Sequence, residues 1–162
     1  MTIIYPYLPA GCEIKLVPET DQFMAEAKKM RFQSATERNQ PSGAVVVEGG
    51  KIIGRGANQS ALKNAFLADL HTKGWCVRHK LKIKTGQKYW LCPGCSNYKL
   101  HSESRAVADA IKNGEVTAGA EVYLWGHWWA CQPCWERMLE AGIKTLYVTD
   151  DAHLRFHGSR KK

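Results

Sequence analysis

Three pairs of potential metal ligands, each with two residues between its members, constrain this chain more than any other feature. Two pairs are Cys-x-x-Cys, and the third has the same spacing with histidine as its second member. They are Cys92 and Cys95, Cys131 and Cys134, and Cys76 and His79. This spacing lets both side chains reach one metal ion while the amides of the intervening turn face the sulfur atoms. The sequence therefore predicts that metal ions organise part of the fold.

Six cysteines could instead form three disulfides, and Cys-x-x-Cys is also a redox motif. Disulfides belong to oxidising compartments, and the N-terminal residues lack the basic and then apolar pattern of a secretion signal. A thioredoxin-like site would need one such pair in a β-α-β context, whereas three pairs are scattered here. We therefore expect metal binding and a cytoplasmic location, with Cys12 as a buried thiol because it has no partner at motif spacing.

The length of 162 residues predicts a single domain over residues 1–162. No apolar run is long enough to cross a membrane, so we expect no membrane association. With 23 Lys and Arg against 15 Asp and Glu, the net charge of +8 favours a phosphate-bearing partner. Much of the excess lies in two segments, at Arg78, Lys80, Lys82, Lys84 and Lys88 and at Arg155, Arg160, Lys161 and Lys162.

Hydrophobic periodicity predicts helices that alternate with strands over most of the chain. Residues 1–20 are expected to be irregular because three prolines interrupt them. The predicted elements are a helix at 21–32, a hairpin at 43–56, a helix at 101–112, a strand at 121–125, a helix at 133–142 and a strand at 143–148. Residues 60–100 have few apolar runs and are predicted to be a metal-stabilised insertion. This order favours an α/β fold with helices on both faces of a partly parallel sheet.

One histidine and two cysteines stand at the starts of two predicted helices that follow strands of this sheet. His101 opens the helix at 101–112, and Cys131 and Cys134 open the next one. Three protein ligands leave one tetrahedral position of a zinc ion open for water, which is the catalytic arrangement. Glu103 lies two residues after the histidine, where it can shuttle a proton of this zinc-activated water without being a ligand.

His101-Ser102-Glu103 followed by Cys131-Gln132-Pro133-Cys134 is typical of zinc deaminases. From about Gly43 to Asp150, the chain resembles the cytidine and deoxycytidylate deaminase superfamily. Segments 42–47 and 54–58 resemble its first two strands, and residues 141–148 resemble the end of its last helix and the following strand. Two positions depart from the family pattern: Ala130 stands where proline usually precedes the first cysteine, and Ser102 stands where alanine is usual.

The resemblance implies a three-layer α/β/α sandwich with a mixed central sheet, a catalytic zinc ion and hydrolytic removal of an amine. It also implies an oligomer of identical chains. At Asn58 it implies a contact to the ribose hydroxyl of the substrate, although a turn residue after a strand explains Asn58 nearly as well.

The remaining ligand pairs predict a second, structural zinc site in the insertion. Twelve residues separate Cys76 and His79 from Cys92 and Cys95, which is close to zinc-finger spacing. Four ligands would close the coordination shell and stabilise a segment that has little core of its own. His71 is an alternative to His79, and Cys76 could instead be a free buried thiol.

His127, Trp128 and Trp129 directly precede the second cysteine motif, in the loop that lines the base pocket in the family. One aromatic ring could stack on a base, or all could pack in the core. With Ser102 and Ala130, these residues complete the predicted substrate contacts.

We expect zinc-dependent deamination of cytosine, foremost in a free nucleotide such as dCMP. A single-stranded DNA or RNA substrate, carrying cytosine or adenine, is the alternative, whereas a silent binding module would not need Glu103.

Overall fold

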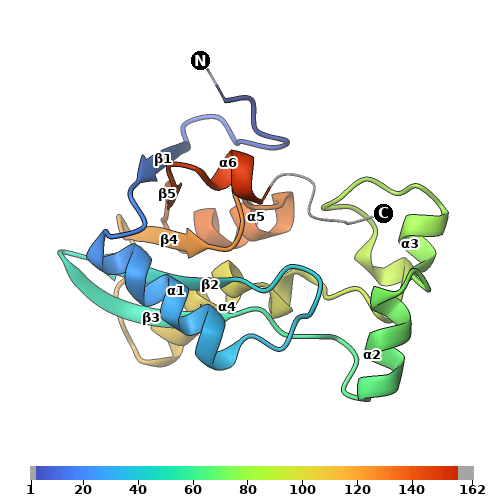
Figure 1. Ribbon diagram of the computed structural model, residues 1–162. Helices are drawn as coiled ribbons and strands as arrows, with labels where there is room; N and C mark the ends of the chain where they lie inside the picture. Colours follow the sequence, from blue (N-terminus) through green and yellow to red (C-terminus); the bar gives the residue numbers. More distant parts are fainter. Residues whose placement is uncertain (1–2, 157–162) are drawn as a thin grey trace.

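The computed structural model describes residues 3–156 (Figure 1). Arg160, Lys161 and Lys162 of the second basic segment lie outside this range. The elements are β1 (Glu13–Val17), α1 (Gln22–Ser34), β2 (Gly43–Glu48), β3 (Lys51–Ala57), α2 (Ala65–Thr72), α3 (Val77–Lys80), α4 (Ser102–Lys112), β4 (Glu121–Trp125), α5 (Gln132–Glu140), β5 (Thr145–Thr149) and α6 (Ala152–Arg155). Two short 3-10 turns, Tyr89–Leu91 and Tyr98–Leu100, precede α4.

The five strands form one mixed sheet in the order β1-β5-β4-β2-β3. β1, β5 and β4 are parallel, whereas β2 pairs antiparallel with both β4 and β3. The β2–β3 hairpin turns at Gly49 and Gly50, whose φ angles of 55° and 78° suit glycine. The mixed sheet predicted from the sequence is therefore confirmed.

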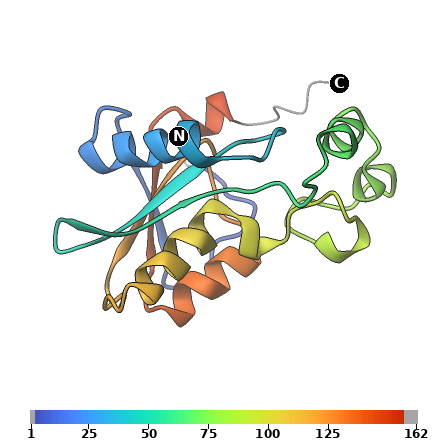
Figure 2. The ribbon, with the colours of Figure 1, turned by 90° about the horizontal axis from the view of Figure 1, so that it is seen from below.

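Helices cover both faces of the sheet, which gives the three layers seen in Figure 2. α1 lies on one face, and its buried Met24 and Ala27 pack with Val45 and Tyr123. α4 and α5 lie on the other face, over alternate residues of the same strands such as Val46. Because successive side chains of a strand point to opposite faces, β2 and β4 supply both cores.

Two glycines of β3 allow α4 to lie directly on the strand. A Cβ atom at Gly56 would overlap the backbone of Ser102 and Ala106, and one at Gly54 would overlap Ala106 and Ala110. No side chain fits in this gap, so helix and strand are in backbone contact. The first turn of α4, which carries the predicted catalytic residues, is thereby held against β3.

The prediction for residues 1–20 was wrong, because β1 occupies 13–17 and pairs with β5. Its apolar positions Ile14 and Leu16 do alternate with Glu13 and Lys15, so a period-two signal was present. Since β1 is a half-exposed edge strand between proline-containing segments, that signal was weak.

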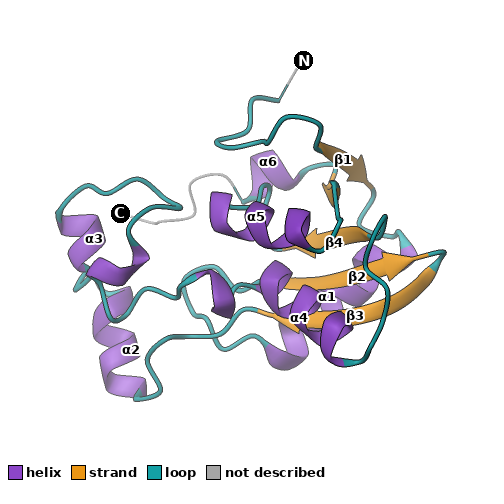
Figure 3. Ribbon diagram, turned by 180° about the vertical axis from the view of Figure 1, so that it is seen from behind, coloured by secondary structure: helices purple, strands orange, loops and turns teal. Residues whose placement is uncertain are grey.

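Residues 60–100, all of them described, contribute no strand and lie beyond one end of the sheet (Figures 1 and 3). They contain α2, α3 and the two 3-10 turns. Within residues 3–156, no helix has the length and apolar character needed to cross a membrane.

We expect the substitution Gly56→Ala to destabilise the fold, because the added methyl group would meet backbone atoms that cannot rotate away. Overpacking of this kind costs about 1–3 kcal/mol, and occasionally more. Urea unfolding would measure the loss, with Ala108→Ser on the exposed face of α4 as the control. An unfolding midpoint for Gly56→Ala equal to that of the control would contradict the close packing.

Candidate active site

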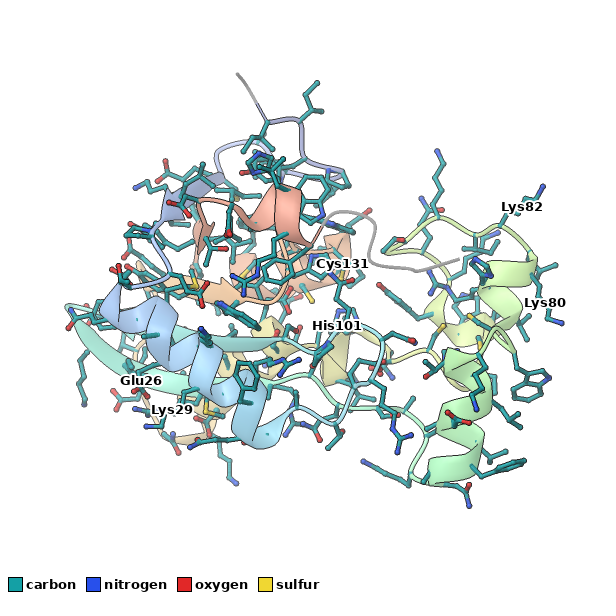
Figure 4. The ribbon with its side chains drawn as sticks, in the orientation of Figure 1. Glu26, Lys29, Lys80, Lys82, His101 and Cys131 are labelled. Carbon is teal, nitrogen blue, oxygen red and sulfur yellow. The ribbon has the colours of Figure 1, made fainter. Side chains whose placement is uncertain are left out.

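His101 and Cys131 each occupy the residue directly before a helix, α4 and α5 respectively. Both have extended backbone angles, and Pro133 sits in the first turn of α5, where proline is well tolerated. Figure 4 shows the His101 and Cys131 side chains close together between the sheet and the insertion. The predicted placement at the starts of two neighbouring helices is therefore confirmed.

The three predicted ligands of the catalytic metal converge on one point. His101 Nδ1 lies 3.5 Å from Cys131 Sγ and 3.4 Å from Cys134 Sγ. For a tetrahedral zinc ion with ordinary bond lengths, the nitrogen-to-sulfur separation is about 3.5 Å. The donor set and its spacing therefore fit zinc.

Three further contacts orient this donor set. His101 Nε2 donates a hydrogen bond to Ser96 O at 3.1 Å, which leaves Nδ1 free to act as a ligand. The Ser104 hydroxyl donates to Cys134 Sγ at 3.5 Å, and the ring of Tyr89 meets that of His101 edge-on at 5.3 Å. The hydrogen bond from Cys134 is the largest of the effects that lower the pKa of Cys131, which favours its thiolate.

Glu103 is buried beside the ligands and is held by a chain of hydroxyl groups. Its Oε2 accepts a hydrogen bond from Ser102 Oγ at 3.0 Å, and Ser102 Oγ lies 2.9 Å from Ser42 Oγ. Burial raises the pKa of Glu103, while the nearby His101 and the Ser102 hydroxyl oppose that rise. A carboxyl group whose proton affinity is raised in this way suits proton transfer.

Ser102, predicted as a substrate contact, is fully buried and contacts Glu103.

Both polar atoms of the Asn58 side-chain amide form hydrogen bonds with the backbone of the loop that precedes β2. Its Oδ1 accepts from Ser42 N and its Nδ2 donates to Gln40 O, each at 2.8 Å. Asn58 therefore shapes the loop beside the site, and a contact to ribose stays a prediction.

The aromatic loop before Cys131 is mostly turned inward. Trp129 and Ala130 are buried in the main core, while Trp128 is half-buried against Tyr5. His127 Nδ1 accepts from the backbone N–H of Trp128 at 3.1 Å, and burial lowers its pKa to about 4. A neutral His127 whose Nδ1 accepts this hydrogen bond carries its proton on Nε2.

In the insertion, the structure groups His71 with Cys76, Cys92 and Cys95, and their ligand atoms lie within 4.8 Å of one another. His79 is not part of this group, whereas His71, the alternative in the sequence analysis, is. The physical reason is the short helix α3, which turns Arg78 inward and leaves His79 exposed. Cys76 Sγ lies 3.5 Å from Cys95 Sγ, a spacing that fits shared coordination.

Several residues of the site were not found from the sequence. Ser42, Ser96 and Ser104 carry no motif, and no signal in a single sequence marks them. In the sequence, Arg78 stood out only as one residue of a basic segment, whereas the structure buries it, with 3% of its surface exposed. Cys12, predicted to be buried, is half-buried against the main core.

Among curated proteins, the chain is similar to ComE operon protein 2 of Bacillus subtilis (strain 168), with 27% identity over 132 residues. The matched region is 80% of this chain and 58% of that protein, so the chain spans little more than half the length of this relative.

Among solved structures, it is similar to the dCMP deaminase of cyanophage S-TIM5 in complex with dCMP and dUMP. The identity is 19%, the TM-score is 0.48, and 91% of this chain and 97% of that chain are covered. It is also similar to the Thermotoga maritima diaminohydroxyphosphoribosylaminopyrimidine deaminase/5-amino-6-(5-phosphoribosylamino)uracil reductase, with 22% identity, a TM-score of 0.46 and coverage of 86% and 34%.

The family model described as the cytidine and deoxycytidylate deaminase zinc-binding region matches residues 18–150. This range is most of the chain, and it includes His101, Glu103 and both cysteines of the second motif. The chain therefore belongs to the family described as the cytidine and deoxycytidylate deaminase zinc-binding region.

Proposed function

We propose that this protein removes the exocyclic amine of a cytosine base by hydrolysis, and that its substrate is a free nucleotide of the dCMP type. The observation that carries the proposal is the convergence of His101, Cys131 and Cys134 beside the buried carboxyl group of Glu103. A protein that only bound zinc structurally would need a fourth protein ligand and no such carboxyl group.

His101 Nδ1, Cys131 Sγ and Cys134 Sγ are the atoms that would hold the catalytic zinc. With three protein ligands, zinc supplies an open coordination position and lowers the pKa of a water there from 15.7 towards about 7. Ser96, through its carbonyl oxygen, keeps the His101 ring in the orientation that this ligand set requires.

Glu103 is the proposed proton shuttle. It takes one proton from the attacking water and delivers it to a ring nitrogen, and it then passes the second proton of that water to the amine, which departs as ammonia. The Ser42–Ser102 pair fixes one oxygen of the carboxylate, so the other remains for the reacting groups. The non-standard serine at position 102 would therefore position the catalytic carboxyl group rather than contact the substrate.

A single nucleotide suits the enclosed surroundings of the site. Trp129 and Ala130 are buried, and the backbone at Gly86 approaches Cys131 and Trp129 from the insertion. Figure 4 shows Lys80 and Lys82 on the outer side of α3, away from His101. Such exposed lysines can attract a phosphate during approach without holding it in the site.

A single-stranded nucleic acid is the second candidate, because the insertion exposes aromatic rings together with lysines. Trp75 and Trp90 are 53% and 80% exposed, and the neighbouring lysines are exposed as well. Aromatic platforms with cations nearby bind single strands without sequence preference.

The oligomer of identical chains also stays a prediction, which light scattering would test.

We propose in addition that His71, Cys76, Cys92 and Cys95 hold a second, structural zinc. Four donors close the coordination shell, and the segment they join has few buried apolar side chains of its own. The binding energy of the metal would then contribute to folding of residues 60–100.

The substitution Glu103→Gln should preserve zinc content but lower deamination by about 10²–10⁴-fold, because the amide cannot accept and return a proton. Ammonia release and atomic emission would measure the two properties. Glu48→Gln, an exposed carboxyl at the end of β2, is the matched control. Near-normal turnover by Glu103→Gln would refute the mechanism.

Atomic emission on the purified protein should find about two zinc ions per chain. His71→Ala should lose one of them and unfold at a lower temperature, whereas His79→Ala should keep both, since His79 is exposed. If His79→Ala lost a zinc ion and His71→Ala did not, the ligand set would be wrong.

Substrate choice can be tested by incubating the protein with dCMP, dAMP and a single-stranded oligonucleotide that contains cytosine and adenine. We expect dCMP to be turned over with the highest kcat/KM. Deamination of the oligonucleotide alone would favour the second candidate, and deamination of dAMP alone would replace cytosine by adenine as the target base.

A further inference from the structure

Arg78 is an arginine in the interior of the insertion, with 3% of its surface exposed. Its guanidinium group makes three hydrogen bonds, two to one loop and one to a cysteine of the second cluster. Nε donates to Gln87 O at 2.7 Å, Nη2 donates to Lys84 O at 3.0 Å, and Nη1 donates to Cys95 Sγ at 3.4 Å. The group also lies over the ring of Tyr89, 4.4 Å from its centroid. A buried charge with this many partners has a specific structural task.

The charge of Arg78 complements the second cluster. Three cysteine thiolates and one neutral histidine around a divalent ion leave a net charge of −1. Arg78 places one positive charge at the sulfur of Cys95, so the buried assembly becomes neutral.

The two carbonyl groups that Arg78 binds belong to the loop of residues 82–88. Lys82 and Lys88, at the two ends of this loop, have φ angles of 52° and 48°, in the left-handed region that non-glycine residues seldom adopt. Such conformations persist where the surroundings hold them in place. Within the loop, Gln87 N donates to Lys84 O, which also accepts from Arg78.

The same loop touches the candidate active site. A Cβ atom at Gly86 would lie 3.6 Å from Cys131 Cβ and 3.8 Å from Trp129 Cη2, which is ordinary van der Waals contact. Tyr89 follows the loop directly, and its ring, beneath Arg78, meets the ring of His101 at 5.3 Å. Arg78 is therefore in contact with the second cluster and with both segments that border the site.

We propose that Arg78 is a positioning residue that uses the second metal cluster as an anchor to hold the 82–88 loop and Tyr89 against the active site. This inference rests on the proposed function, to which it adds a reason for the insertion to carry a metal. The metal cluster holds Cys95 in place, and Cys95 orients the guanidinium group. The guanidinium group in turn holds the 82–88 loop and Tyr89 beside Cys131 and His101.

Arginine is required for this task because its planar group spreads several donors over a fixed fork. A lysine at position 78 would keep the charge but would offer a single nitrogen, which cannot span Gln87 O, Lys84 O and Cys95 Sγ together. Arg78→Lys therefore separates the geometry of the guanidinium group from its charge.

The test compares full-length, zinc-loaded wild-type protein with Arg78→Met, Arg78→Lys and the control Arg55→Met, an exposed arginine of β3. Zinc content is measured by atomic emission, deamination by kcat and KM, and loop opening by brief trypsin digestion with mass spectrometry. Trypsin can cut after Lys82, Lys84 and Lys88, and these cuts report on the loop whether or not the protein is active.

We expect both Arg78 variants to be cut in the 82–88 loop about tenfold faster than wild type, while Arg55→Met is not. Arg78→Lys should keep both zinc ions and lower kcat/KM by about 10- to 100-fold, the range that small misplacements of a site produce. Wild-type protection of the loop in Arg78→Lys would overturn the proposal, as would wild-type kinetics. If Arg78→Met does not fold, the result for Arg78→Lys alone decides whether Arg78 holds the loop.

A wild-type protein that does not deaminate any nucleotide would refute the proposed function, and the trypsin comparison would still decide whether Arg78 holds the loop.

Discussion

The backbone contact between α4 and β3 is the constraint on which the candidate site depends. Because Gly56 has no side chain, the carbonyl of Ser102 and the amide of Ala106 lie directly on the strand. The first turn of α4 is thereby fixed to the sheet, and with it His101 and Glu103. α5 packs beside α4 on the same face and brings Cys131 and Cys134 to the same point. A larger residue at position 56 would move one half of the donor set away from the other.

The insertion is a second structural unit with a different source of order. Its large apolar side chains are exposed, as Phe66, Trp75 and Trp90 are, or only half-buried, so burial contributes little to its folding. Four ligand atoms within 4.8 Å and one buried arginine supply connections that a hydrophobic core supplies elsewhere. Ser96 and the 82–88 loop of this unit both reach the active site, so its order and that of the site are linked.

The convergence of His101, Cys131 and Cys134 was predictable because each lies in a short local motif at the start of a helix. The hairpin at β2 and β3, strand β4 and the three long helices were predictable for a similar reason, since periodicity and glycine turns are local. Strand β1 was missed because its partner β5 lies about 130 residues away along the chain and its own alternation is short. The pairing register that stabilises it depends on the complete sheet.

The sequence by itself determined which residues offer donor atoms for zinc, which carboxyl group accompanies them, and that strands and helices alternate around them. Only the tertiary structure placed His71 of α2, and not the exposed His79 of α3, beside the three cysteines, because the path of the chain between these helices is not a local property of the sequence. It also showed that Arg78, which the sequence marks only as part of a basic segment, is buried in the insertion. Residue type sets what a side chain can do, whereas burial and neighbours, which come from the whole fold, set what it does.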